Sequence, residues 1–179
     1  MQLLKKELVT HFTFMLAFFL LISVANGMFE FRHIVFWFGG IFGTLLPDVD
    51  HFIYAKFLKP NEESAVSATE MSKKSFIAAY EYLIKRNVDN AKLVFHNANF
   101  QLIFFVFAFL VVTSSGNLLG IGLVLAFLVH LIVDELIDFF ERNRLSNWFV
   151  GFLLKLDSRQ EKWFLGFNIV GVFLLGFML

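Results

Sequence analysis

The sequence contains no cysteine, and its charges balance. The lack of cysteine excludes disulfides and thiolate metal sites, so any metal ion must be held by His, Asp, Glu or water. The net charge of zero offers no basic surface to a nucleic-acid partner. Charged residues make up only 17% of the chain, whereas hydrophobic residues make up 58%. Because this apolar share exceeds that of an ordinary soluble domain, it predicts a membrane protein.

Five apolar runs predict an all-α membrane protein with about five transmembrane helices. A helix needs about 20 apolar residues, within a range of about 17–25, to cross the hydrocarbon core. The second run is shorter and contains three glycines, so it fits either a helix packed closely on a neighbour or a re-entrant segment. We find no internal repeat or low-complexity linker, and residues 1–179 are interpreted as a single helical membrane domain. The runs cover residues 12–28, 33–46, 98–113, 118–137 and 163–179.

The first run also resembles a secretory signal peptide. Lys5 and Lys6 precede it, and Ala25 and Gly27 stand where a small-residue cleavage site would lie. The other four runs predict a membrane protein under either interpretation.

The basic residues predict how the helices are oriented. With the N-terminus in the cytoplasm and all five runs crossing, Arg32 is the one residue among the 15 lysines and arginines that falls outside. This asymmetry is the pattern of the positive-inside rule, and it persists when the long loop 53–95 is left out. The sequence therefore predicts a multi-pass protein of the cell (inner) membrane with a cytoplasmic N-terminus.

Two polar stretches lie on the cytoplasmic side in this topology. Loop 53–95 contains Ser-Ala-Thr-Glu at 67–70, which is typical of a capping box, followed by apolar residues at helical spacing. It predicts an amphipathic helix over 67–86 that lies on the membrane face or over a site, or else a solvated connector helix. The stretch 141–162 mixes charges with aromatic residues and predicts an interfacial amphipathic segment.

Four of the five histidines and three aspartates fall at the cytoplasmic ends of the predicted helices. His33 lies at the outer end and is interpreted as an unrelated interfacial residue. Ionisable groups beside membrane segments are costly, and His and Asp together are donors that a divalent metal accepts. The predicted metal ligands are His11, Asp48, His51, His96, His130 and Asp134.

The spacing of two residues in the fourth run supports this site. His130 and Asp134 are four residues apart, so on a helix they share a face and can hold one ion together. Asp138 continues that face, and we expect it to orient His130. The alternative is a hydrogen-bonded His–Asp pair that only supports helix packing.

The run Pro-Asp-Val-Asp-His at 47–51 is more specific. Proline suits the first turn of a new helix, on which Asp48 and His51 share a face. Asp50 points elsewhere, and we predict it to be a general base or a ligand of a second ion. The alternative is a helix terminus with acidic capping by Asp48.

The run at 43–51 resembles the G-x-x-x-P-D-x-D-H signature of small membrane-bound metal-dependent hydrolases, the group containing the YdjM-like inner-membrane proteins. The resemblance extends to an early His11, to His96 before a membrane helix and to the late His-x-x-x-Asp, and so covers most of the chain. That family is described as related to zinc-dependent phospholipase C, which implies a zinc hydrolase without naming its substrate. This chain departs from the family at 95–101. The family has His-Arg-Gly-x-Thr-His-Ser there, whereas this chain has a single histidine, His96.

Three functions follow as hypotheses. The favoured one is a metal-dependent hydrolase at the cytoplasmic membrane face, with zinc, or else Mn²⁺ or Fe²⁺, and with Asp50 as general base. Its partners would be the lipid membrane and a small-molecule or lipid substrate of phosphoester or phospholipid type. The second is a non-catalytic membrane protein with a structural metal site. The third is a small ion or metal transporter, which requires ionisable residues along a path through the bilayer, whereas here they lie on one side.

Overall fold

A computed structural model describes residues 2–58, 60–85 and 93–179, and this part of the chain is helical without a strand. Each of the five predicted apolar runs corresponds to a helix, although the first helix begins well before residue 12 and ends at Ala25, before residue 28. The five are α1 (Gln2–Ala25), α2 (Ile34–Leu45), α6 (Ala98–Ser114), α7 (Leu118–Arg142) and α8 (Ser158–Phe177).

Shorter helices fill the connections. Pro47 follows α2 and begins the 3-10 helix η2, so the helical path continues beyond α2. Proline is tolerated at this position because the first turn of a helix does not use its missing N–H. The connecting elements are η1 (Phe31–His33), η2 (Pro47–Val49), α3 (Asp50–Ile53), the π-helical η3 (Tyr54–Leu58), α4 (Glu63–Ser72), α5 (Phe76–Lys85) and η5 (Ser146–Phe149).

The single amphipathic helix predicted over 67–86 is wrong. Helix α4 begins earlier, with Glu62 in extended backbone as its N-cap, so Ser67 lies inside the helix and caps nothing. The chain then turns at 73–75 and α5 begins. Residue 86 lies outside the described part of the chain. The predicted helix is thus a hairpin of two helices.

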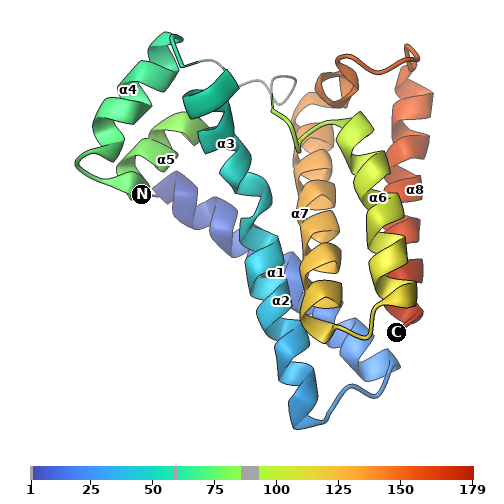
Figure 1. Ribbon diagram of the computed structural model, residues 1–179. Helices are drawn as coiled ribbons and strands as arrows, with labels where there is room; N and C mark the ends of the chain where they lie inside the picture. Colours follow the sequence, from blue (N-terminus) through green and yellow to red (C-terminus); the bar gives the residue numbers. More distant parts are fainter. Residues whose placement is uncertain (1, 59, 86–92) are drawn as a thin grey trace.

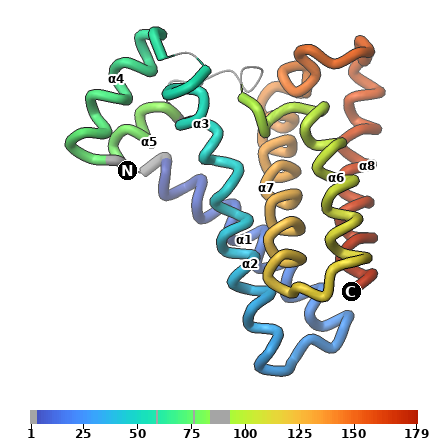
Figure 2. Tube along the Cα trace, viewed as in Figure 1, coloured from blue at the N-terminus to red at the C-terminus, as the bar shows by residue number. Residues whose placement is uncertain are grey.

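Helix α7 lies at the centre of the arrangement (Figure 1). It packs against α2 on one side and against α6 and α8 on the other, while α1 crosses behind α2. The short connections after α1 and after α6 lie at one end of the bundle (Figure 2). The elements η2 to α5 and the stretch between α7 and α8 lie at the other end, which we call the loop end. This alternation is the one that the sequence predicts.

Two helices are long and apolar enough to cross a membrane, Leu4–Ala25 and Leu118–Arg142, and α6 is a shorter apolar helix. Apolar side chains also cover the outside of the bundle. Large hydrophobic side chains exposed on α1, α2, α6 and α8 include Leu20, Phe42, Ile103, Leu110, Val170 and Leu174. Soluble monomers rarely expose so much apolar surface.

Helices α2 and α7 touch through their backbones. A Cβ atom at Gly43 would meet the carbonyl oxygen of Leu123, and one at Gly122 would meet the carbonyl oxygen of Phe36. Glycine is therefore required at this contact, as in close helix pairs of membrane proteins. Of the two interpretations of the second run, the structure shows the closely packed helix. The contact brings the end of α2 against the middle of α7.

Gly43→Ala is expected to lower the thermal unfolding midpoint of the detergent-solubilised protein by several degrees. The added methyl group forces apart two backbones, and overpacking costs typically about 1–3 kcal/mol. Gly166→Ala is the matched control, because a Cβ atom there meets nothing within 4 Å. If both variants unfold at the wild-type temperature, the proposed α2–α7 contact is wrong.

Candidate metal centre

Five of the six predicted ligands meet at the loop end. They come from α1, from η2, from the segment before α6 and from α7. Two overlapping groups have donor atoms that all lie within 4.8 Å of one another: His11, His130 and Asp134, and Asp48, His96 and His130.

Asp134 is the centre of this cluster. Its Oδ1 lies 3.0 Å from His11 Nε2, and its Oδ2 lies 3.0 Å from His96 Nε2 and 3.2 Å from His130 Nε2. Asp48 Oδ1 lies 3.5 Å from the same His130 nitrogen. In the described part of the chain, the ion pairs of these two aspartates are all with histidine.

The other ring nitrogen of each imidazole, Nδ1, makes a hydrogen bond on the side away from the cluster. His11 Nδ1 donates to the Glu7 carbonyl at 2.9 Å, and His130 Nδ1 donates to the Thr44 carbonyl at 2.7 Å. Because a carbonyl oxygen can only accept, each Nδ1 carries the proton, and Nε2 of the neutral ring has a free lone pair. This is the arrangement that metal-binding histidines adopt.

A lone pair that faces a carboxylate is unfavourable unless a cation lies between them. His130 Nε2 is buried and makes no hydrogen bond within the described residues, although two carboxylates are near. The rings of His11 and His130 stack with centroids 4.0 Å apart, so protonating both would place two positive charges face to face. A metal ion shared by the Nε2 atoms and the carboxylates removes both conflicts.

In the metal-free protein, a proton on His96 supplies part of the positive charge that an ion would provide. Burial lowers the pKa of His96, but hydrogen bonds to Asp134 and Asp50 outweigh it and raise the pKa to about 10. His96 is thus an imidazolium between two carboxylates in the metal-free protein. Metal binding must displace this proton.

Asp50 lies behind His96 rather than in the open part of the cluster. It is fully buried and accepts hydrogen bonds from the backbone N–H of Val94 at 3.0 Å and from that of Phe95. Its Oδ2 is also 3.3 Å from His96 Nδ1. The carboxylate therefore fixes the segment before α6 and orients the ring of His96, which is a positioning role.

The prediction that Asp138 orients His130 is wrong. Asp138 accepts a hydrogen bond from Trp148 Nε1 at 2.9 Å and so ties η5 to α7. His130 is oriented by the Thr44 carbonyl instead, which the glycine contact of α2 with α7 brings into reach.

His51 belongs to neither group of donors, and its role as a ligand stays a prediction. Its ring centroid lies 6.0 Å from that of His96 and 6.3 Å from that of Tyr80. Burial, and then the charge of His96, lower the pKa of His51 to about 4, which keeps the ring neutral. His33 ends η1, in the connection between α1 and α2, and its Nδ1 accepts a hydrogen bond from the Glu30 backbone N–H.

Sequence reasoning missed two residues at the site. Glu7 lies one turn before His11 on α1, and Asp134 and Asp48 are its charged neighbours. The spacing of four from His11 was a usable signal, the same as that of His130 and Asp134. Tyr80 on α5 donates a hydrogen bond to Asp48, and burial and the Asp48 charge raise its pKa, so the phenol stays protonated. No short-range pattern links Tyr80 to Asp48.

The site opens to the surface on its carboxylate side. The side chains of Asp48 and Asp134 are 22% and 21% exposed, whereas those of His11, His96 and His130 are at most 7% exposed. Helix α5 packs against α1 and α3 beside this opening, and so forms one wall of the site.

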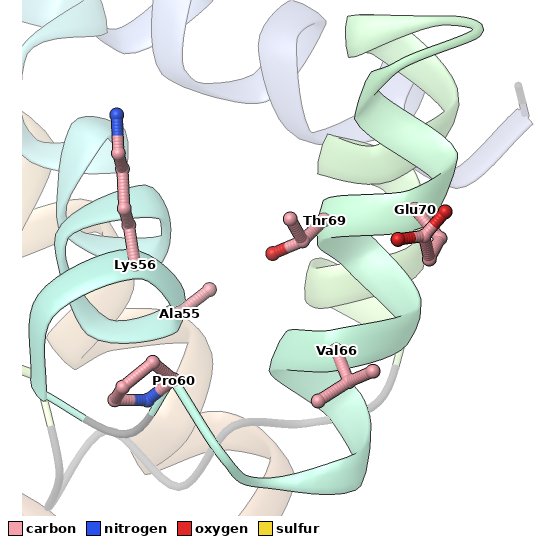
Figure 3. A pocket seen from close by; sticks show the side chains of 6 residues that line it. All are labelled: Ala55, Lys56, Pro60, Val66, Thr69 and Glu70. Carbon is pink, nitrogen blue, oxygen red and sulfur yellow. The ribbon is translucent and has the colours of Figure 1, made fainter.

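A separate cavity of about 240 Å³ lies between η3 and α4 (Figure 3). None of its lining residues belongs to the His/Asp cluster. They are Ala55, Lys56, Pro60, Val66, Thr69 and Glu70.

No protein-family model, curated protein or solved structure matches the chain. The interpretation of the site therefore depends on its geometry and on the chemistry of its donors.

Asp134→Ala is expected to abolish Zn²⁺ binding, because this residue contacts all three imidazoles of the cluster. Metal per chain, measured by plasma mass spectrometry on detergent-purified protein, should fall from at least one ion to none. Glu70→Ala, which removes an exposed carboxylate paired with Lys73, is the control and should keep its metal. Equal metal content in both variants would contradict the assignment.

Asp50→Asn is expected to weaken Zn²⁺ binding by about 10- to 100-fold without abolishing it, as is typical for residues that orient a ligand. Competition with a chromogenic chelator measures this affinity. Complete loss of metal would instead identify Asp50 as a direct ligand.

Proposed function

We propose that α1, α2, α6, α7 and α8 all cross the membrane, with the N-terminus in the cytoplasm. The exposed apolar side chains on α1, α2, α6 and α8, the alternating connections and the distribution of Lys and Arg support this. Helix α2 alone rises about 18 Å, less than the roughly 30 Å of the hydrocarbon core, so η1 and η2 extend its crossing to the two faces of the membrane. The loop end with the His/Asp cluster then faces the cytoplasm.

We infer that the chain is a membrane-bound metal-dependent hydrolase. One observation carries this inference: three imidazoles with anchored Nδ1 atoms direct their Nε2 atoms at one carboxylate. Nitrogen and carboxylate donors without cysteine form a set that Zn²⁺ accepts, and Mn²⁺ or Fe²⁺ accept the same set. The residues that would hold the ion are His11, Asp48, His96, His130 and Asp134.

When bound, such an ion polarises a phosphoryl or acyl oxygen and makes water a stronger acid. The protein's own residues supply the remaining functions. Asp50 orients His96, and the half-buried Glu7 replaces Asp50 as the proposed general base, since its carboxylate neighbours Asp48 and Asp134 at the open side. The resemblance to the YdjM-like hydrolases and the position at the membrane end favour a phosphoester or phospholipid-type substrate.

A structural metal site is the second candidate. The five donors come from four separate parts of the chain, so an ion there would also tie α1, η2, the start of α6 and α7 together. A coordination sphere filled by protein characterises structural sites, whereas catalytic sites keep a position open. The partial exposure of Asp48 and Asp134 favours the catalytic alternative.

The zinc-loaded protein is expected to hydrolyse at least one member of a panel of phosphomonoesters, phosphodiesters and phospholipids, and chelation should stop turnover. Glu7→Gln should keep its metal but lose about 10²- to 10⁴-fold in kcat, the usual contribution of a general base. A metal-loaded wild type that is inactive on every substrate would favour the structural site.

A further inference from the structure

Two hydrogen-bond donors border the open side of the metal cluster without belonging to it. Tyr80 comes from α5 and His51 from α3, and their rings meet edge to face with centroids 6.3 Å apart. His51 lies between Tyr80 and His96, since it also contacts the His96 ring at 6.0 Å. The two side chains thus connect α5 to His96 through successive ring contacts.

One of these side chains has a nitrogen without a partner, which can donate when it carries the imidazole proton. His51 Nδ1 is buried and makes no hydrogen bond within the described part of the chain. An unpaired buried polar atom is destabilising, so a group that accepts a hydrogen bond from it would be bound favourably. The second donor, the Tyr80 hydroxyl, donates to Asp48, and its hydrogen can rotate toward another acceptor.

The position of Tyr80 is fixed by packing. Its ring stacks on Phe52 with centroids 5.7 Å apart and an interplanar angle of 12°. Ala79 and Leu83, on the same helix, are fully buried. Because the ring is held on both sides, its hydroxyl is directed at the edge of Asp48 rather than into solvent.

We propose that Tyr80 and His51 form an oxyanion subsite that binds the phosphoryl group of the substrate beside the metal. The inference rests on the proposed function and names the side chains that would recognise the phosphoryl group of its substrate. An anionic oxygen accepts hydrogen bonds from the phenol O–H and the imidazole N–H, while the metal side takes another oxygen of the same group. Charge-assisted bonds of this kind are about twice as strong as neutral ones.

Binding of inorganic phosphate to the zinc-saturated full-length protein in detergent, measured by isothermal titration calorimetry, tests this subsite. Tyr80→Phe should weaken phosphate binding by about 10- to 100-fold, the cost of losing a hydrogen bond to a charged group, with zinc content unchanged. Tyr82→Phe removes a hydroxyl two residues along the same helix and should bind as the wild type does. His51→Phe keeps the ring contact with Tyr80 but removes its nitrogens, and it should weaken phosphate binding as well.

The outcomes separate this inference from the proposed function. A wild type that binds no metal overturns both. A zinc-loaded wild type that does not bind phosphate, or that binds it as tightly in Tyr80→Phe and His51→Phe, overturns the subsite alone. Glycerol phosphate in solution and phosphatidic acid in nanodiscs then distinguish a free from a lipid-borne phosphate, since both present the same group.

Discussion

At the loop end, the Asp134 carboxylate lies within 3.2 Å of three imidazole nitrogens, and positive charge among these groups stabilises the arrangement. Each imidazole is fixed from behind, by the Glu7 carbonyl, the Thr44 carbonyl or the Asp50 carboxylate, so none can turn its Nδ1 toward the cluster instead. The free Nε2 lone pairs and the carboxylates then repel one another unless positive charge lies among them. A proton on His96 supplies some of that charge, and the proposed divalent ion would supply the rest.

The fold serves this arrangement through the contact of α2 with α7. Because Gly43 and Gly122 let the two backbones touch, the last turn of α2 delivers the Thr44 carbonyl to His130 and then places Asp48 beside it. The same contact lies among the apolar helices, where small residues allow close packing. Stability of the bundle and geometry of the site are therefore linked in one interface.

The sequence predicts much of the fold because the apolar runs and the Lys and Arg distribution are strong one-dimensional signals. It also predicts the ligands that are close in sequence, since helical spacing places His130 and Asp134 on one face. It fails where the partner is distant: Tyr80 reaches Asp48 from another helix, and the anchor of His130 is a backbone carbonyl 86 residues away rather than Asp138. The sequence also predicts the wrong start for α4. Ser67 and Glu70 have the spacing of a capping box, but they lie inside a helix whose N-cap is Glu62.

X-ray absorption at the zinc edge of the purified, zinc-loaded protein tests the central claim most directly. The account predicts a first shell of nitrogen and oxygen at about 2.0–2.2 Å, with the outer-shell scattering of about three imidazole rings. An oxygen-only shell without imidazole scattering, or a protein that retains no zinc, would contradict the account.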